Sequence, residues 1–150
     1  MRMFLAVLAV LAATAAAAAD ERPAIEYLNS GKVVPPTLPF SEAVRVGKTL
    51  YLSGQVGIKP GTMQLVPGGI REEARQALQN IKTSLEANGY AMGDVVKCTV
   101  MLADISEWAA FNEVDQTFFP APYPARSALG ANGLALGARV EVECIAAIDR

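Results

Sequence analysis

Arg-Val-Glu-Val-Glu-Cys-Ile-Ala, residues 139–146, alternates apolar and charged side chains, as a half-buried β-strand does. A proline-bounded segment, Tyr-Pro-Ala-Arg-Ser at 123–127, leads into another predicted strand over 126–129. Glu141 lies in the first segment and Arg126 in the second. The two strands therefore supply one carboxylate and one cation that can meet in a cleft, where a small acid and a water molecule would fit.

The residues before these strands predict a β-hairpin followed by a loop. Alternating runs at 43–46 and 49–53 are joined by Gly47 and Lys48, and two-residue connections of this kind close hairpins. Turn residues then gather between 59 and 69 and enclose a loop with room for a small strand.

Two helices and a further strand follow the hairpin. Residues 70–88 repeat apolar side chains at helical spacing and end at Gly89, a residue suited to a left-handed helix cap. The β-branched run at 94–102 predicts a central strand. A second helical stripe begins after Asp104 and is broken by Pro120. This order predicts an α+β fold with both helices on one face of the sheet, and the uncovered face predicts self-association.

The N-terminus has the pattern of a secretory signal peptide over residues 1–19. Arg2 precedes a short apolar run, and an alanine tract ends at Ala19. An uncleaved membrane anchor is the alternative, but the apolar run is shorter than the roughly 20 residues that a spanning helix needs. Residues 20–37 are predicted to form an extended arm before an ordered domain at 38–150. The mature protein is expected to be secreted or periplasmic, with no membrane contact.

Composition excludes several classes of chemistry. The chain has no histidine, so it carries neither a Ser-His-Asp triad nor a zinc site of ordinary spacing, and no metal is expected. Its net charge is −2 and no basic run is present, which does not favour a nucleic-acid partner. Cys98 and Cys144 each lie within an apolar strand, where buried free thiols are favoured over a disulfide because the sequence does not fix their separation.

Each candidate site residue also has a structural interpretation. Arg126 suits a bidentate carboxylate contact, but an ion pair with an acid of the same domain is the alternative. Glu141 suits proton relay at a raised pKa, whereas exposed strand glutamates are common. The pair Ser53 and Gly54 permits close approach of a ligand or simply ends a strand. Asn112, on the second helix, faces either solvent or a site.

The ordered motifs of the chain resemble the RidA (YjgF/YER057c/UK114) family, as an exported member. The motifs are Leu-Pro-Phe-Ser-Glu-Ala-Val (38–44), Leu-Tyr-Leu-Ser-Gly-Gln-Val-Gly (50–57), Gln-Ala-Leu-Gln-Asn-Ile-Lys (76–82), Asp-Val-Val-Lys-Cys-Thr-Val (94–100), Phe-Asn-Glu-Val (111–114), Pro-Ala-Arg-Ser (124–127) and Val-Glu-Val-Glu-Cys-Ile-Ala (140–146). The resemblance implies a chorismate-mutase-like (YjgF-like) α+β fold with a mixed β-sheet, assembled as a homotrimer with clefts between subunits.

The activity implied by the resemblance is the hydrolysis of reactive enamine or imine acids, such as 2-aminoacrylate, to 2-oxo acids and ammonia, with no cofactor. Arg126 matches the arginine that binds the substrate carboxylate, and Glu141 matches the glutamate that positions or activates water. Ser53 and Gly54 match a loop that lines the cleft, and Asn112 matches a cleft-facing polar residue.

Two substrate-binding positions depart from the family pattern. Phe40 stands where many relatives carry Tyr, and Ala128 stands where many carry Cys. Together with the predicted export, these departures motivate an alternative function: a non-catalytic trimeric module that binds or protects small carboxylates.

Overall fold

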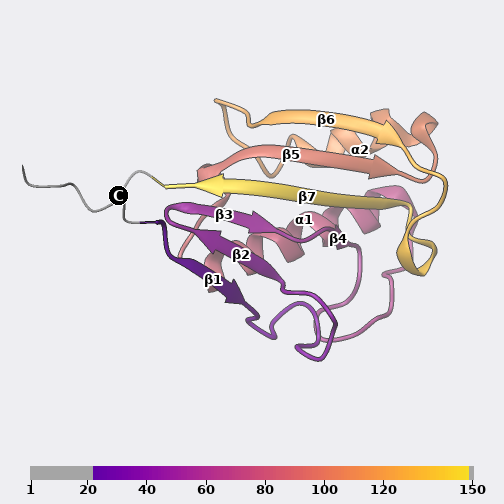
Figure 1. The fold of residues 1–150 in the computed structure, drawn as a ribbon. Helices are drawn as coiled ribbons and strands as arrows, with labels where there is room; N and C mark the ends of the chain where they lie inside the picture. The colour runs from indigo at the N-terminus through magenta and orange to yellow at the C-terminus, as the bar shows by residue number, and fades with distance from the viewer. Residues whose placement is uncertain (1–21, 149–150) are drawn as a thin grey trace, which may run out of the picture.

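The protein, here a computed structural model, is described over residues 22–148 (Figure 1). The predicted signal peptide lies outside the described residues. The strands are β1 (Ile25–Leu28), β2 (Ala43–Val46), β3 (Thr49–Leu52), β4 (Gln55–Val56), β5 (Val95–Leu102), β6 (Ala125–Gly130) and β7 (Val140–Ala147). The helices are α1 (Ile70–Ala87) and α2 (Trp108–Asp115), with short 3-10 turns at Met92–Asp94, Ile105–Glu107 and Ala135–Gly137.

The strands form one mixed sheet in the order β1-β2-β3-β7-β5-β6, with β4 also paired to β7. β5 and β6 run parallel, and the other pairs are antiparallel. The alternation at 139–146 corresponds to the two faces of β7 in the sheet. Val140, Val142 and Cys144 are buried on one face, while Glu141 and Glu143 point to the other.

Both helices cover the same face of the sheet, so the predicted α+β architecture is confirmed (Figure 1). α1 buries a continuous apolar stripe that includes Leu78, Ile81 and Leu85. It ends as predicted, because Gly89 adopts the left-handed φ of 83° and the amide of Tyr90 returns to the carbonyl of Leu85. No helix within residues 22–148 is long and apolar enough to cross a membrane.

The segment before residue 38 is extended where the sequence predicts an arm, but part of it belongs to the sheet. β1 pairs with β2 along its whole length, which makes it an edge strand. Val33 and Val34 are buried with Ile58 in a small second cluster. Ordered structure therefore begins before residue 38, because the arm supplies both a strand and apolar contacts.

Cys98 and Cys144 form a disulfide, so the expectation of free thiols is wrong. The two cysteines are direct cross-strand partners on β5 and β7, and their Cα atoms lie 4.2 Å apart. That register brings them together on the buried, helix-facing side of the sheet. The pairing of β5 with β7, which could not be predicted from the sequence, determines that both cysteines are joined in a disulfide.

The face of the sheet opposite the helices carries both apolar and charged side chains. Tyr51 and Leu129 are 48% and 46% exposed there. On the same face the Nζ of Lys97 donates a hydrogen bond to the Oγ of Ser127 at 2.7 Å. No element within the described residues covers this face (Figure 1).

Candidate functional site

Arg126 and Glu141 lie on opposite faces of the sheet. Arg126 is in register with Cys98 on β5, which pairs with Cys144 on the helix-facing side. Glu141 is in register with Met101 on β5. Met101 and Cys98 point to opposite faces of the sheet, so Glu141 points to the uncovered side. Because side chains alternate along strands, the two charges cannot meet within one chain. The expected cleft with both charges is therefore absent from the single described chain.

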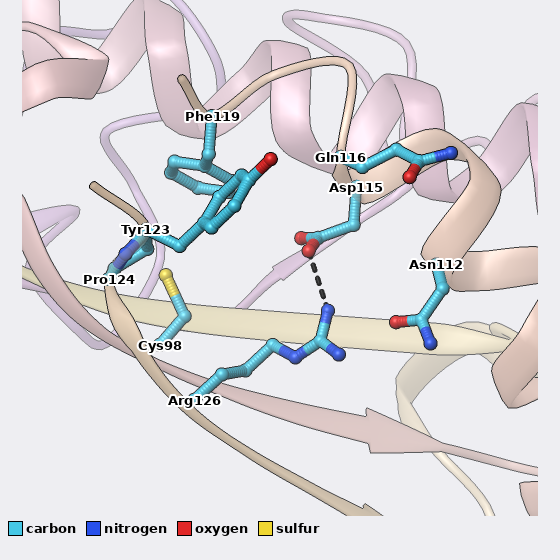
Figure 2. Close-up of a pocket in the computed structure, with 8 residues that line it drawn as sticks. All are labelled: Cys98, Asn112, Asp115, Gln116, Phe119, Tyr123, Pro124 and Arg126. Carbon is cyan, nitrogen blue, oxygen red and sulfur yellow. Dashed lines mark hydrogen bonds and ion pairs between the residues drawn. The ribbon is translucent and has the colours of Figure 1, made fainter. Parts of the chain in front are cut away.

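Arg126 lies against helix α2 at a cavity of about 380 Å³ (Figure 2). The lining residues are Cys98, Asn112, Asp115, Gln116, Phe119, Tyr123, Pro124 and Arg126. The Nη1 of Arg126 donates to the Oδ2 of Asp115 at 2.6 Å, and the guanidinium carbon lies 5.8 Å from the ring centre of Phe111. The ring and the carboxylate hold the guanidinium at the cavity wall.

Asp115 is a site residue that sequence reasoning missed. Burial raises the pKa of its carboxyl, and the nearby Arg126 opposes that rise. Asp115 lies three positions after Asn112 on α2, so both side chains emerge on one face of the helix, toward Arg126 (Figure 2). The three-residue spacing from Asn112, which was already a candidate, was the sequence signal that could have identified Asp115.

Asn112 lies in the cavity wall. Of its two predicted orientations, the structure therefore has the one that faces a candidate site rather than bulk solvent. Its Oδ1 is buried and has no hydrogen-bond partner among the described residues. Buried polar atoms are rarely left unpaired, and this acceptor therefore marks a place where a ligand donor would be stabilised.

Glu141 and Gly54 form the centre of a second group of predicted residues. β4 pairs with β7 so that Val56 faces Glu141, and this brings Gly54 against the glutamate side chain. A Cβ at position 54 would lie 2.0 Å from the Oε1 of Glu141, so the carboxylate can keep this position only beside glycine. Burial, and secondarily the charge of Glu143, raises the pKa of Glu141. Glu141 is therefore a better proton acceptor than an exposed glutamate.

Ser53 connects this second group to the segment that carries Phe40. The Oγ of Ser53 donates to the carbonyl of Ser41 at 2.7 Å, and its amide donates to the carbonyl of Glu42. These bonds hold the loop ending at Ser41 beside Gly54. Phe40 is 49% exposed on that loop, so it is available to a ligand or a partner chain.

Ala128 belongs with Arg126 rather than with Glu141. It lies two positions after Arg126 on β6, is exposed, and therefore shares the face of the arginine. The predicted residues thus divide into two half-sites. Half-site A contains Arg126, Asn112 and Ala128, and half-site B contains Glu141, Gly54, Ser53 and Phe40.

The fold and these half-sites define a class of small α+β proteins with a cavity beside an arginine of the sheet. Solved structures of that class are similar to this chain. RidA from an Antarctic Psychrobacter superimposes with a TM-score of 0.77 at 41% identity, covering 82% of this chain and 99% of that one. The YjgF gene product of E. coli gives a TM-score of 0.77 at 31% identity, covering 83% and 99%.

Sequence comparison gives the particular family. The family model described as endoribonuclease L-PSP matches residues 31–148. The 2-iminobutanoate/2-iminopropanoate deaminase of Mus musculus is 49% identical over 108 residues, which cover 72% of this chain and 80% of the relative. The corresponding human deaminase is 45% identical over 72% of this chain and 79% of its own. The chain belongs to the RidA/YjgF/L-PSP family.

Proposed function

We propose that this protein hydrolyses reactive enamine or imine acids, of the 2-aminoacrylate type, to 2-oxo acids and ammonia without a cofactor. The observation that carries the proposal is the Arg126 guanidinium at the cavity wall, with only Nη1 bonded to another described residue. Nε and Nη2 remain for a substrate carboxylate. The deaminase relatives act on imino acids of this size by name, and they support the same reaction here.

The reaction needs few protein groups, because an iminium carbon is already electrophilic. Water attacks C2 of the imino acid, forms the C–O bond, and moves the C=N π electrons onto nitrogen. Glu141 takes the proton that this water loses, and its raised pKa suits that role. Protonated Glu141 then returns this proton to the nitrogen of the resulting carbinolamine. The C–N bond breaks and ammonia leaves, while the C=O bond forms and the hydroxyl proton passes back to Glu141. Arg126 holds the carboxylate so that C2 is presented to the water.

A complete site requires a second copy of the chain, since half-sites A and B lie on opposite faces of one sheet. We propose the homotrimer that the family resemblance implies, with each cleft taking half-site A from one subunit and half-site B from its neighbour. The uncovered sheet face, with exposed Tyr51 and Leu129, is the surface available for such packing.

Export is part of the proposal. The sequence pattern of residues 1–19 predicts a signal peptide. The Cys98–Cys144 disulfide supports the same compartment independently, because disulfides persist in secreted and periplasmic proteins and are rare in reducing cytosol.

The test is the release of ammonia and 2-oxo acid from an imine generated in situ by an amino-acid oxidase. We expect wild type to accelerate release and Arg126→Ala to lose that acceleration. Glu113→Gln is the matched control, since Glu113 is an exposed acid of α2 paired with Arg71 outside the cavity. Absence of acceleration by wild type would overturn the proposal. RNA is included as a control substrate, because the family model that matches this chain is described as endoribonuclease L-PSP.

The alternative function, a trimeric module that only binds small carboxylates, is favoured by one observation. Asp115 already occupies Nη1 of Arg126, so the arginine is partly neutralised before any ligand arrives. The same assay separates the two functions. A binding module would form a complex in which the imine or its carboxylate analogue persists, whereas steady turnover rules that module out.

A further inference from the structure

The Arg126 cavity contains an acid beside the cation that is expected to bind a carboxylate. The Oδ2 of Asp115 accepts from Nη1 of Arg126 at 2.6 Å, and the two side chains are 14% and 26% exposed. An arginine alone would favour any small anion. The pair instead places a positive and a negative group side by side, with little net charge offered to a ligand.

Two hydrogen-bond acceptors at the cavity wall lack partners. The Oδ1 of Asp115 accepts no hydrogen bond from a described residue, and the Oδ1 of Asn112 is buried without a partner. Both side chains turn toward the guanidinium (Figure 2). A ligand that pairs with all three of these polar side chains therefore needs an anionic group for Arg126 and N–H donors for Asp115 and Asn112.

An imino acid has those groups on adjacent carbons. Its carboxylate is an anion, and its protonated nitrogen carries N–H donors and positive charge. The 2-oxo acid formed by hydrolysis keeps the carboxylate but replaces the nitrogen by an oxygen that only accepts. That oxygen would face the acceptors of Asp115 and Asn112, where it is repelled and leaves both unpaired.

We infer that Asp115 is a specificity-determining residue that makes the Arg126 cavity select zwitterionic 2-imino and 2-amino acids over 2-oxo acids and plain monocarboxylates. The inference rests on the proposed function and deepens it, since the same group that recognises the substrate nitrogen disfavours the product. Asn112 contributes a second acceptor without charge. Product release is then assisted by the loss of the nitrogen rather than by a separate motion of the protein.

Direct titration calorimetry with a matched ligand pair tests the inference. L-2-aminobutanoate and 2-oxobutanoate share a carbon skeleton and a carboxylate and differ only at C2. We expect wild type to bind aminobutanoate about tenfold more tightly, the size of one charge-assisted hydrogen bond. In Asp115→Asn the aminobutanoate affinity should fall and the oxobutanoate affinity rise, each by roughly tenfold, so that the preference reverses.

The control variant is Glu113→Gln, which removes the same charge from the same helix outside the cavity and should keep the wild-type preference. The inference is overturned if wild type binds oxobutanoate at least as tightly, a result that needs no variant to fold. It is also overturned if folded Asp115→Asn keeps the wild-type preference. Titration needs no turnover, so a protein that shows the reversal without hydrolysing imines overturns the proposed reaction and supports the selectivity.

Discussion

Arg126 and Glu141 project from opposite faces of one β-sheet, on strands separated by β5. The register fixes this relationship, because Arg126 aligns with Cys98 and Glu141 aligns with Met101, and these two residues of β5 point to opposite faces of the sheet. A small ligand cannot contact both charges of one chain through the sheet.

Mixing two inactive variants should restore activity. If each site takes Arg126 from one subunit and Glu141 from its neighbour, Arg126→Ala and Glu141→Gln are complementary. Random reassembly of equal amounts should regenerate about a quarter of the sites in a cyclic oligomer. The measurement is imine hydrolysis after dissociation and reassociation. Activity that stays at the level of the separate variants would contradict a shared site.

Gly54→Ala should impair turnover with little loss of stability. The added Cβ would meet the Oε1 of Glu141 at 2.0 Å, but a carboxylate at the end of a flexible side chain can move away. We expect the free energy of unfolding to fall by less than about 1 kcal/mol while kcat falls by about tenfold or more, because the water-activating group is displaced. Denaturant melts and steady-state kinetics measure both quantities.

Gly93→Ala is the control for that variant, since a Cβ there would meet nothing within 4 Å. It should leave kcat unchanged. A Gly54→Ala protein with wild-type kcat would show that the Glu141 carboxylate has no required position.

The acidic limb of the pH profile should depend on Glu143. Burial and then the charge of Glu143 raise the pKa of Glu141, and a water-activating carboxylate must be ionised. Glu143→Gln removes the like charge, so the pKa of Glu141 should fall and the limb of kcat/KM should move to lower pH. Glu86→Gln, on the exposed side of α1, should not move it. If the acidic limb does not move in Glu143→Gln, the group whose titration produces it is not Glu141.

Glu141 should also lower stability at neutral pH. Its pKa in the folded protein lies above its ordinary value, so folding favours the protonated form. The stabilising contribution of Glu141 is present at low pH and is lost as the pH rises through the folded pKa. Glu141→Gln should therefore be more stable than wild type at neutral pH, with the difference shrinking in acid. Thermal melts across pH would reveal this trend, and a less stable variant at neutral pH would contradict it.

Removing the disulfide should destabilise the fold. Cys98 and Cys144 are 46 residues apart in sequence, and closing a loop of that length is worth roughly 2–4 kcal/mol. The Cys98→Ala, Cys144→Ala double variant should lose about that much free energy of unfolding, without leaving a lone thiol. Equal denaturant midpoints for the double variant and oxidised wild type would be the contrary result.

Much of the local structure could be predicted from the sequence because it depends on periodicity. The alternation at 139–146 predicted β7, and the apolar stripe ending at Gly89 predicted α1 to within a residue of its end. Family motifs then selected the site residues. β1 was missed because its short alternating run lies in a segment whose prolines indicated an arm.

What the sequence by itself determined was most of the strands and both helices, and that two of the strands carry a cation, Arg126, and a carboxylate, Glu141. Only the tertiary structure decided how these residues face one another. Shifting a strand by one position moves every side chain to the opposite face, so register alone separates Arg126 from Glu141 and joins Cys98 to Cys144. Register is set by pairing between distant segments, and packing of α2 on the same face brought Asp115 to Arg126.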